Sequence, residues 1–211
     1  MIKFENVSKK IGKNIILDDI NIEFHTGCIY GLRGSNGSGK TMLMRVIAGL
    51  MKPTSGSVYI DDKKLYKDMD FPDSIGILIE NPAFIGNVRG LENLKLLASY
   101  TDSEPERVAR EAMEACGLNP DDKRRYSKYS LGMKQKLGVA AAIMGGPDII
   151  LLDEPINAID EDGVALVKDA LLKLKEDRII IVACHDREEL DYLADEIYLV
   201  KEGHVYEQKA K

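Results

Sequence analysis

Eight consecutive residues combine glycines with a lysine and a threonine in an order that suits a polyphosphate ligand. They follow an apolar run ending at Leu32 and precede a helical pattern over roughly Lys40 to Ala48, and they read Gly34-Ser35-Asn36-Gly37-Ser38-Gly39-Lys40-Thr41. Glycines let backbone N–H groups converge on phosphate oxygens, and a helix start adds about half a positive charge. Lys40 would reach the β and γ phosphates and Thr41 would ligate Mg2+. The flanking strand and helix favour this interpretation over a glycine turn with an incidental lysine.

A second apolar run ends in two carboxylates. Ile149 to Leu152 is followed by Asp153, Glu154 and Pro155. Taken alone, a strand ending in this way is more often an ordinary turn. With the phosphate motif nearby, Asp153 is a candidate Mg2+ ligand and Glu154 a candidate base for an attacking water. Both strands would then end on the same edge of a parallel sheet, where such sheets bind ligands.

Three further residues have an ordinary structural explanation when considered alone. Glu80 ends the apolar run Ile75 to Ile79, as a surface residue at a strand end does. His185 follows Ile179 to Cys184, where a histidine usually has a satisfied hydrogen bond. Ser130 would cap a helix that runs to about Met144.

The elements that must position these residues alternate between strands and helices. The first thirty residues alternate like strands, and the later pattern of short apolar runs and helical periods indicates an α/β fold with a mainly parallel sheet. We expect parallel strands over Cys28 to Leu32, Ile75 to Ile79, Ile149 to Leu152 and Ile179 to Ala183. We also expect a helical insert before the third of these strands. It would contain a helix over Gly90 to Tyr100 and a second helix that ends at Cys116 and starts with a capping box of Ser103 and Glu106.

Composition narrows the function classes. The chain of 211 residues suits one globular domain. Its net charge of -6, with both signs mixed, argues against a nucleic-acid partner. Its three cysteines are too widely separated for a C-x-x-C pair, so neither a disulfide framework nor a zinc site is expected, and a reducing cytosol fits better. No apolar run approaches the roughly twenty residues that cross a bilayer, so we expect any membrane role to depend on a partner.

Together these motifs resemble the ATP-binding-cassette ATPases, the nucleotide-binding subunits of ABC transporters. The order and spacing match from the phosphate loop through a signature at Tyr129 to Met133, the carboxylates Asp153 and Glu154, a D-loop at Asn157 to Asp160 and the histidine His185. The resemblance implies a P-loop NTPase fold over residues 1–211. This fold has a parallel core, an N-terminal antiparallel β subdomain and a helical subdomain inserted over roughly 84–145.

The resemblance also implies roles for individual residues. Glu154 would be the catalytic base, assisted by Lys40, by Glu80 and by His185 on the γ-phosphate. Thr41, Glu80 and Asp153 would hold Mg2+. ATP would be bound by residues 34 to 41, Met42 and Ile11 of one chain. Ser130 and Gly132 of a second chain would complete the ATP site.

Several positions depart from the family pattern. Leu131 replaces the usual glycine of the signature, and Ile11 replaces an aromatic ring that stacks on adenine. Glu80 replaces a glutamine. A glutamate at that position resembles the subunits of bacitracin- and lantibiotic-export-like transporters, and the sequences following Asn81 and Gly90 fit that branch.

The predicted function is that of an ATP-hydrolysing subunit that dimerises head to tail and powers export. It would work at the inner face of the membrane through a separate transmembrane permease, contacted by Gly90 to Tyr100 and the loop around Asn81 to Asn87. The alternative is a soluble ABC ATPase that acts as a nucleotide-gated interaction module. Such relatives usually carry a long coiled coil or two cassettes, and neither is present. A cassette that binds ATP without hydrolysis is disfavoured because the catalytic residue types are all present.

Overall fold

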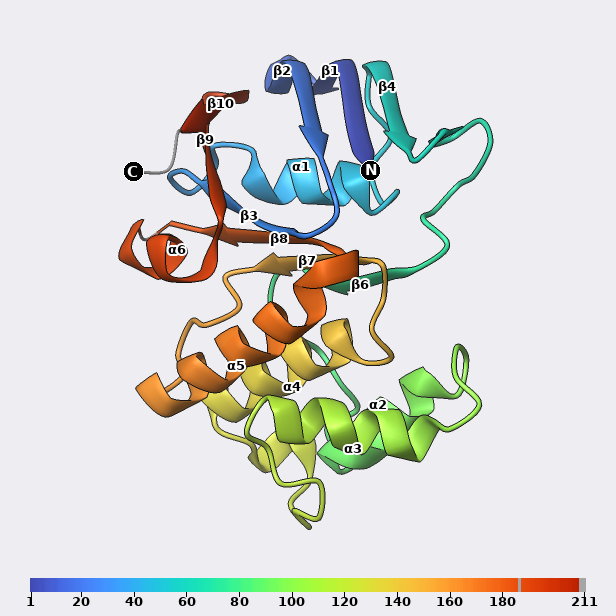
Figure 1. Ribbon diagram of the computed structural model, residues 1–211, viewed down its shortest axis with the longest axis vertical. Coiled ribbons are helices and arrows are strands. Elements are labelled where there is room, and N and C mark those ends of the chain that lie inside the picture. Colours follow the sequence, from blue (N-terminus) through green and yellow to red (C-terminus); the bar gives the residue numbers. More distant parts are fainter. Residues whose placement is uncertain (186, 209–211) are drawn as a thin grey trace.

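The structure, a computed structural model, describes residues 1–185 and 187–208 and stacks two sheets and several helices in layers (Figure 1). The outermost layer is a four-stranded antiparallel sheet whose strands, in spatial order, are β2 (Asn14–Phe24), β1 (Ile2–Ile11), β4 (Ser55–Ile60) and β5 (Lys63–Lys64). The expected N-terminal antiparallel β subdomain is thus confirmed. Two of its strands come from beyond the first helix.

The second sheet has six strands, and its centre is parallel as predicted. In spatial order they are β10 (His204–Gln208), β9 (Glu196–Lys201), β3 (Cys28–Arg33), β8 (Ile179–Cys184), β7 (Ile149–Asp153) and β6 (Ile75–Leu78). The four expected parallel strands are β3, β8, β7 and β6. The antiparallel pair β9–β10 was not predicted. Its signal is the two-residue turn Glu202-Gly203, where both residues have positive φ (50° and 82°), as tight hairpins require.

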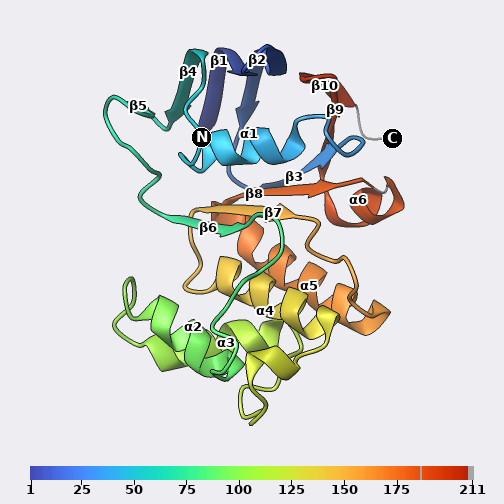
Figure 2. The same ribbon diagram turned by 180° about the vertical axis from the view of Figure 1, so that it is seen from behind.

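Helix α1 (Lys40–Ile47) lies between the two sheets, and the remaining helices cover the other side of the six-stranded sheet (Figure 1). These are α2 (Gly90–Ala98), α3 (Pro105–Ala115), α4 (Leu131–Ile143), α5 (Glu161–Leu174) and α6 (Arg187–Leu193), with short 3-10 turns at Tyr126–Lys128 and Lys175–Asp177. From behind, the chain that leaves β6 runs down across α4 to reach α2 (Figure 2). The helices α2, α3 and α4 therefore form the inserted helical layer.

The six-stranded sheet divides the core in two, and the alternation of its side chains decides where each functional residue points. Ile149 and Leu151 pack with α1 and the antiparallel sheet, whereas Ile150 and Leu152 pack with the helical layer. All four are at most 4% exposed, as expected for a parallel strand buried on both faces. Asp153 continues the series on the α1 side.

The expected capping box of α3 is wrong. The helix begins at Pro105 with Glu104 as N-cap, and no side chain caps it. Proline at the first helical position needs no N–H partner and disfavours helical geometry in the residue before it, so the start is set one residue later than expected. Glu106 instead pairs with Lys95 at 3.0 Å.

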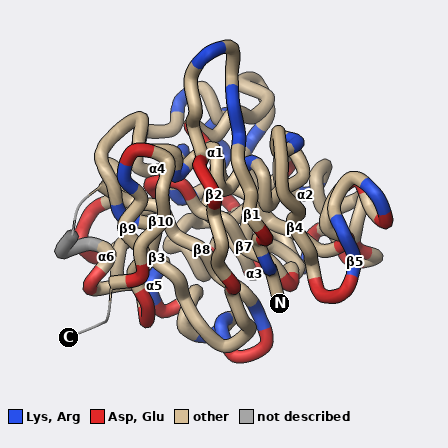
Figure 3. Tube along the Cα trace, turned by 90° about the horizontal axis from the view of Figure 1, so that it is seen from above, with Lys and Arg blue, Asp and Glu red and all other residues tan. Residues whose placement is uncertain are grey.

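In the view of Figure 3, acidic and basic residues alternate along the chain trace, and positions of both signs occur on most segments. Within residues 1–185 and 187–208, none of the helices combines the length and the apolar character that crossing a bilayer requires.

Candidate active site

The glycine-rich segment forms a loop between β3 and α1, at the edge of the sheet where the parallel strands end. Gly37 and Gly39 have φ of 80° and 116°, which glycine adopts without strain. A Cβ on Gly34 would lie 2.2 Å from the Val200 carbonyl oxygen, so this approach also requires glycine. Lys40 is buried, and its Nζ donates to the carbonyl oxygens of Gly34 at 2.6 Å and Ser35 at 3.3 Å. Two of its three N–H donors thus hold the loop curled around the start of α1.

A pocket of about 460 Å3 opens in front of this loop. Its lining residues are Ile16, Asn36, Gly37, Ser38, Gly39, Lys40, Thr41, Met42, Asp153 and Glu154. Ser38 Oγ is buried and has no hydrogen-bond partner among the described residues, which is typical of a polar atom that awaits a ligand. Thr41 Oγ1 donates to Asp153 Oδ2 at 2.6 Å, so two hard oxygen ligands lie side by side. The pocket therefore fits a polyphosphate with Mg2+.

Burial is the main cause that raises the pKa of the Asp153 carboxyl above its ordinary value, and the nearby charge of Glu154 adds to the effect. The hydrogen bond from Thr41 and the charge of Lys40 act in the opposite direction but do not cancel it. Binding of a divalent cation stabilises the ionised form of such a buried carboxylate, because the cation replaces the hydration that burial removes.

Glu154 is held in an uncommon backbone conformation by both of its peptide groups. Its φ is 50°, which costs a non-glycine residue about 1–3 kcal/mol. Its N–H donates to the Ala183 carbonyl at 2.8 Å, and its own carbonyl accepts from Nε2 of the buried Gln135 at 2.7 Å. Gln135, on α4, was not predicted. No signal in the sequence pointed to it, because Gln135 stands between Lys134 and Lys136 and has the character of one more surface residue.

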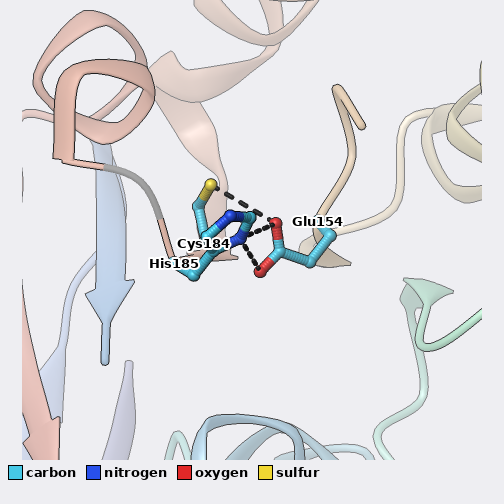
Figure 4. Close-up of side chains that lie close together, drawn as sticks. All are labelled: Glu154, Cys184 and His185. Atoms are coloured by element: carbon cyan, nitrogen blue, oxygen red, sulfur yellow. Dashed lines mark hydrogen bonds and ion pairs between the residues drawn. The ribbon is translucent and has the colours of Figure 1, made fainter. Parts of the chain in front are cut away.

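The carboxylate of Glu154 lies against the end of β8 (Figure 4). His185 Nδ1 is 3.1 Å from each of its oxygens, and Cys184 Sγ is 3.4 Å from Oε2. The structure thus brings the predicted base and the predicted histidine together. It also adds the buried thiol of Cys184, which was not assigned to the site from the sequence.

Glu80 lies just beyond β6, outside the lining of the pocket. Its φ is 65°, and its carboxylate forms an ion pair of 2.5 Å with Arg45 Nη2 on α1. The glutamate side chain is 64% exposed and the arginine 33%. The predicted Mg2+ role of Glu80 stays a prediction, and the structure supplies a partner, Arg45, that competes for the same oxygens.

Three side chains bear on the predicted contact with adenine. Ile11, at the end of β1, is 49% exposed and lies outside the lining of the pocket. Ile16, on β2, and Met42, on α1, both line it. The contact of Ile11 with adenine stays a prediction, and Ile16 is a lining residue that sequence reasoning missed.

The signature residues lie at the start of α4, away from the pocket. Ser130 Oγ accepts from the Met133 N–H at 3.2 Å, which confirms the predicted cap. A Cβ on Gly132 would lie 2.5 Å from the Ala158 carbonyl oxygen, so glycine allows the signature to pack on the D-loop. Leu131 between them is 67% exposed. A single chain therefore does not bring Ser130 and Gly132 to the phosphate loop.

Comparison with known proteins agrees with this geometry. The family model of the ABC transporter matches residues 17–157. The chain is 45% identical to the ABC transporter ATP-binding protein YybJ of Bacillus subtilis strain 168, over 92% of this chain and 90% of that protein. It is 36% identical to the bacitracin transport ATP-binding protein BcrA of Enterococcus faecalis, over 99% of this chain and 68% of the relative. It is 32% identical to the lantibiotic transport ATP-binding protein SrtF of Streptococcus pyogenes, over 99% and 90%.

Among solved structures, one similar chain is the ATP-binding cassette MJ0796, described as a dimer in a post-hydrolysis state bound to ADP and Pi. The TM-score is 0.88 at 29% identity, and the match covers 100% of this chain and 99% of that one. The similarity extends over both sheets and the helical layer.

Proposed function

Since this chain belongs to the ABC transporter family and is an ATP-hydrolysing ATP-binding subunit, we propose that it works as a head-to-tail homodimer that powers export through a separate membrane permease. In this proposal the dimer lies on the cytoplasmic face of the membrane and uses ATP with Mg2+. No nucleic acid takes part.

The observation that supports the proposal is that the phosphate pocket and the signature residues lie apart in a single chain. The phosphate pocket lies at the ends of β3 and β7, whereas the exposed segment Ser130-Leu131-Gly132 lies at the start of α4. A two-fold dimer would place each exposed segment on the other chain's pocket, because the contacts of such an interface are reciprocal. Leu131, a large exposed apolar side chain beside two small residues, is then a contact with the partner.

The pocket residues divide the work of hydrolysis. The backbone of residues 34 to 41 and Lys40 would hold the phosphates, with Met42 and Ile11 assigned to the rest of the nucleotide. Thr41 and Asp153, joined by Glu80 once it leaves Arg45, would hold Mg2+, which when bound offsets phosphate charge. Glu154 would accept a proton from the attacking water, and His185 would orient that carboxylate and contact the γ-phosphate.

The helical layer offers the surface for the permease. The apolar side chains Leu96 and Leu97 in the last turn of α2 are 47% and 46% exposed, Tyr100 just after the helix is 81% exposed, and Ile85 on the preceding loop is 48% exposed. Buried Asn93 joins loop to helix: its Oδ1 accepts from the Ile85 N–H at 2.9 Å, and its Nδ2 donates to backbone carbonyls of the loop. These hydrogen bonds tie the loop to α2. Segment 84–145 is proposed as the subdomain that transmits closure to the permease.

The names of two relatives point to the cargo. Because BcrA and SrtF are named for bacitracin and lantibiotic transport, we assign this chain a peptide antibiotic as cargo. A host strain carrying Glu154→Gln should then become more sensitive to such peptides than a strain carrying the wild-type gene. Equal sensitivity to every peptide tested would contradict the cargo, although not the export function.

Capture of the partner tests the export function itself. Affinity-tagged wild-type chain, isolated from membranes, should retain a polytopic protein encoded in the same genome. Tyr100→Asp should lose it, whereas Tyr206→Asp, which changes an exposed tyrosine on β10, should retain it. Both variants should hydrolyse ATP like wild type when isolated. Recovery of only soluble proteins with all three chains would favour the nucleotide-gated interaction module.

A further inference from the structure

Three different metal-ligating side chains meet where β7 and β8 end (Figure 4). They are the carboxylate of Glu154, the thiol of Cys184 and the imidazole of His185, and one ligand atom of each lies within 4.8 Å of the others. Two of the separations are much shorter: 3.1 Å from His185 Nδ1 to the carboxylate and 3.4 Å from Cys184 Sγ to Oε2. The thiol therefore points at the carboxylate proposed as catalytic base.

This set of donors suits zinc. A tetrahedral Zn2+ binds sulfur at about 2.3 Å and nitrogen or oxygen at about 2.0–2.2 Å, which places its ligand atoms roughly 3.4–3.6 Å apart. The separations in the structure bracket that value, so small side-chain rotations bring all three atoms into position. Three protein ligands leave one tetrahedral position for water, and the exposed imidazole of His185 shows that the cluster is reached from solvent. We propose that Glu154, Cys184 and His185 form an inhibitory site for Zn2+ or a similar soft divalent cation.

The cluster is chemically distinct from the neighbouring Mg2+ position. Thr41 and Asp153 offer only oxygen atoms, which Mg2+ prefers. Cys184 and His185 offer sulfur and nitrogen, which select zinc over magnesium. Neither Cys184 nor His185 lines the phosphate pocket. The two positions thus bind different metal ions because their donor atoms differ. When zinc binds, the Cys184 thiol loses its proton to solvent.

Zinc at this site would stop turnover without displacing the nucleotide. It would occupy the carboxylate that must accept a proton from water, and it would hold His185 away from the phosphate. The phosphate loop and Thr41 would remain available. Inhibition of ATP hydrolysis by zinc rests on the proposed roles of Glu154 and His185. Binding of zinc does not depend on those roles.

Binding is measured first, on nucleotide-free protein. Zn2+ affinity is determined by competition with a chromophoric chelator, and Co2+ is used as a probe because a thiolate ligand gives it a charge-transfer absorption band. Cys184→Ser should remove the band and weaken Zn2+ binding by more than the roughly ten- to hundredfold that loss of an outer-shell partner costs. His185→Gln should also weaken it. Cys28→Ser, which changes a half-buried thiol on β3, should bind like wild type.

Inhibition is measured second, with Zn2+ kept far below the concentration of Mg2+-ATP. Wild type and Cys28→Ser should lose ATPase activity, and Cys184→Ser should need correspondingly more zinc, each relative to its own rate without zinc. Zinc affinity that is equal in all variants, or a Co2+ spectrum without a thiolate band, would overturn the site. A chain that binds zinc as expected but hydrolyses no ATP would instead contradict the proposed function.

Discussion

Replacing Gln135 by leucine tests how the fold holds the proposed base. The amide donates to the Glu154 carbonyl at 2.7 Å from a buried position on α4, and leucine keeps the bulk but removes the donor. The carbonyl keeps a longer hydrogen bond of 3.3 Å from the Asn157 N–H, and loss of the shorter one from Gln135 costs about 1–3 kcal/mol. For a chain of this size each kcal/mol lowers Tm by about 2–4 °C, so we expect a fall of about 2–12 °C.

The same change should slow catalysis. Glu154 has a φ of 50°, and its peptide groups are held by the Ala183 carbonyl at 2.8 Å, by Gln135 at 2.7 Å and by a longer hydrogen bond of 3.3 Å from the Asn157 N–H. Without the hydrogen bond from Gln135 the peptide relaxes and the carboxylate shifts, and a displacement on the order of 1 Å can cost about a hundredfold in rate. We therefore expect kcat to fall about ten- to hundredfold while KM for ATP changes little, because Gln135 does not line the phosphate pocket.

Asn93→Leu is the matched control, since Asn93 is also a buried amide that holds backbone groups, but in the helical layer. Steady-state ATPase assays are run below the Tm of both variants, which is measured by calorimetry. Asn93→Leu should lose stability and keep the kcat of the isolated subunit. If Gln135→Leu also kept its kcat, Gln135 would be a packing residue and the reasoning about Glu154 would be refuted.

Two further variants test the metal position. Burial raises the pKa of Asp153, so its ionised form opposes folding: the stability of the apo protein falls as pH rises from the unfolded pKa through the raised folded one. Asp153→Asn should therefore raise Tm at pH 7, with a difference that vanishes below about pH 4, and should lose Mg2+-dependent ATPase activity; an unchanged Tm at pH 7 would contradict this. Arg45→Gln should lower the Mg2+ midpoint of ATPase activity by up to about fivefold, because the exposed pair with Glu80 is worth at most about 1 kcal/mol. The effect should disappear in a Glu80→Gln background, and identical midpoints in a Mg2+ titration would leave Glu80 a surface residue at a strand end.

Features that depend on local order could be predicted from the sequence. The phosphate loop needs glycines, Lys40 and Thr41 at fixed spacing between a strand and a helix, and both the loop and its flanking elements are found as expected. The carboxylates were placed by a similar argument, because parallel strands end on one edge of a sheet. The hydrogen bond between Thr41 and Asp153 follows from the position of the phosphate loop and from the common edge at which the parallel strands end.

Features that depend on packing between distant elements could not be predicted in this way. The hydrogen bond from Gln135 to Glu154 depends on how α4 lies under β7, and the pair of Arg45 with Glu80 depends on where the chain leaves β6. Cys184 is buried at the end of β8, but period-two alternation alone did not show that its sulfur reaches Glu154. The start of α3 was missed because the proline at the first helical position outweighed the capping-box pattern.

The central claim is that one active site needs two chains, and the mass of Glu154→Gln in ATP tests it most directly. This variant should bind ATP, lose about a hundred- to ten-thousandfold in turnover, and remain closed. Light scattering after gel filtration should give about twice the 23.5 kDa of one chain with ATP and a single chain without it. Adding Leu131→Asp, at an exposed position outside the pocket, should abolish the dimer and leave ATP binding intact. A Glu154→Gln chain that binds ATP yet stays monomeric, or a double variant that dimerises equally well, would contradict the claim.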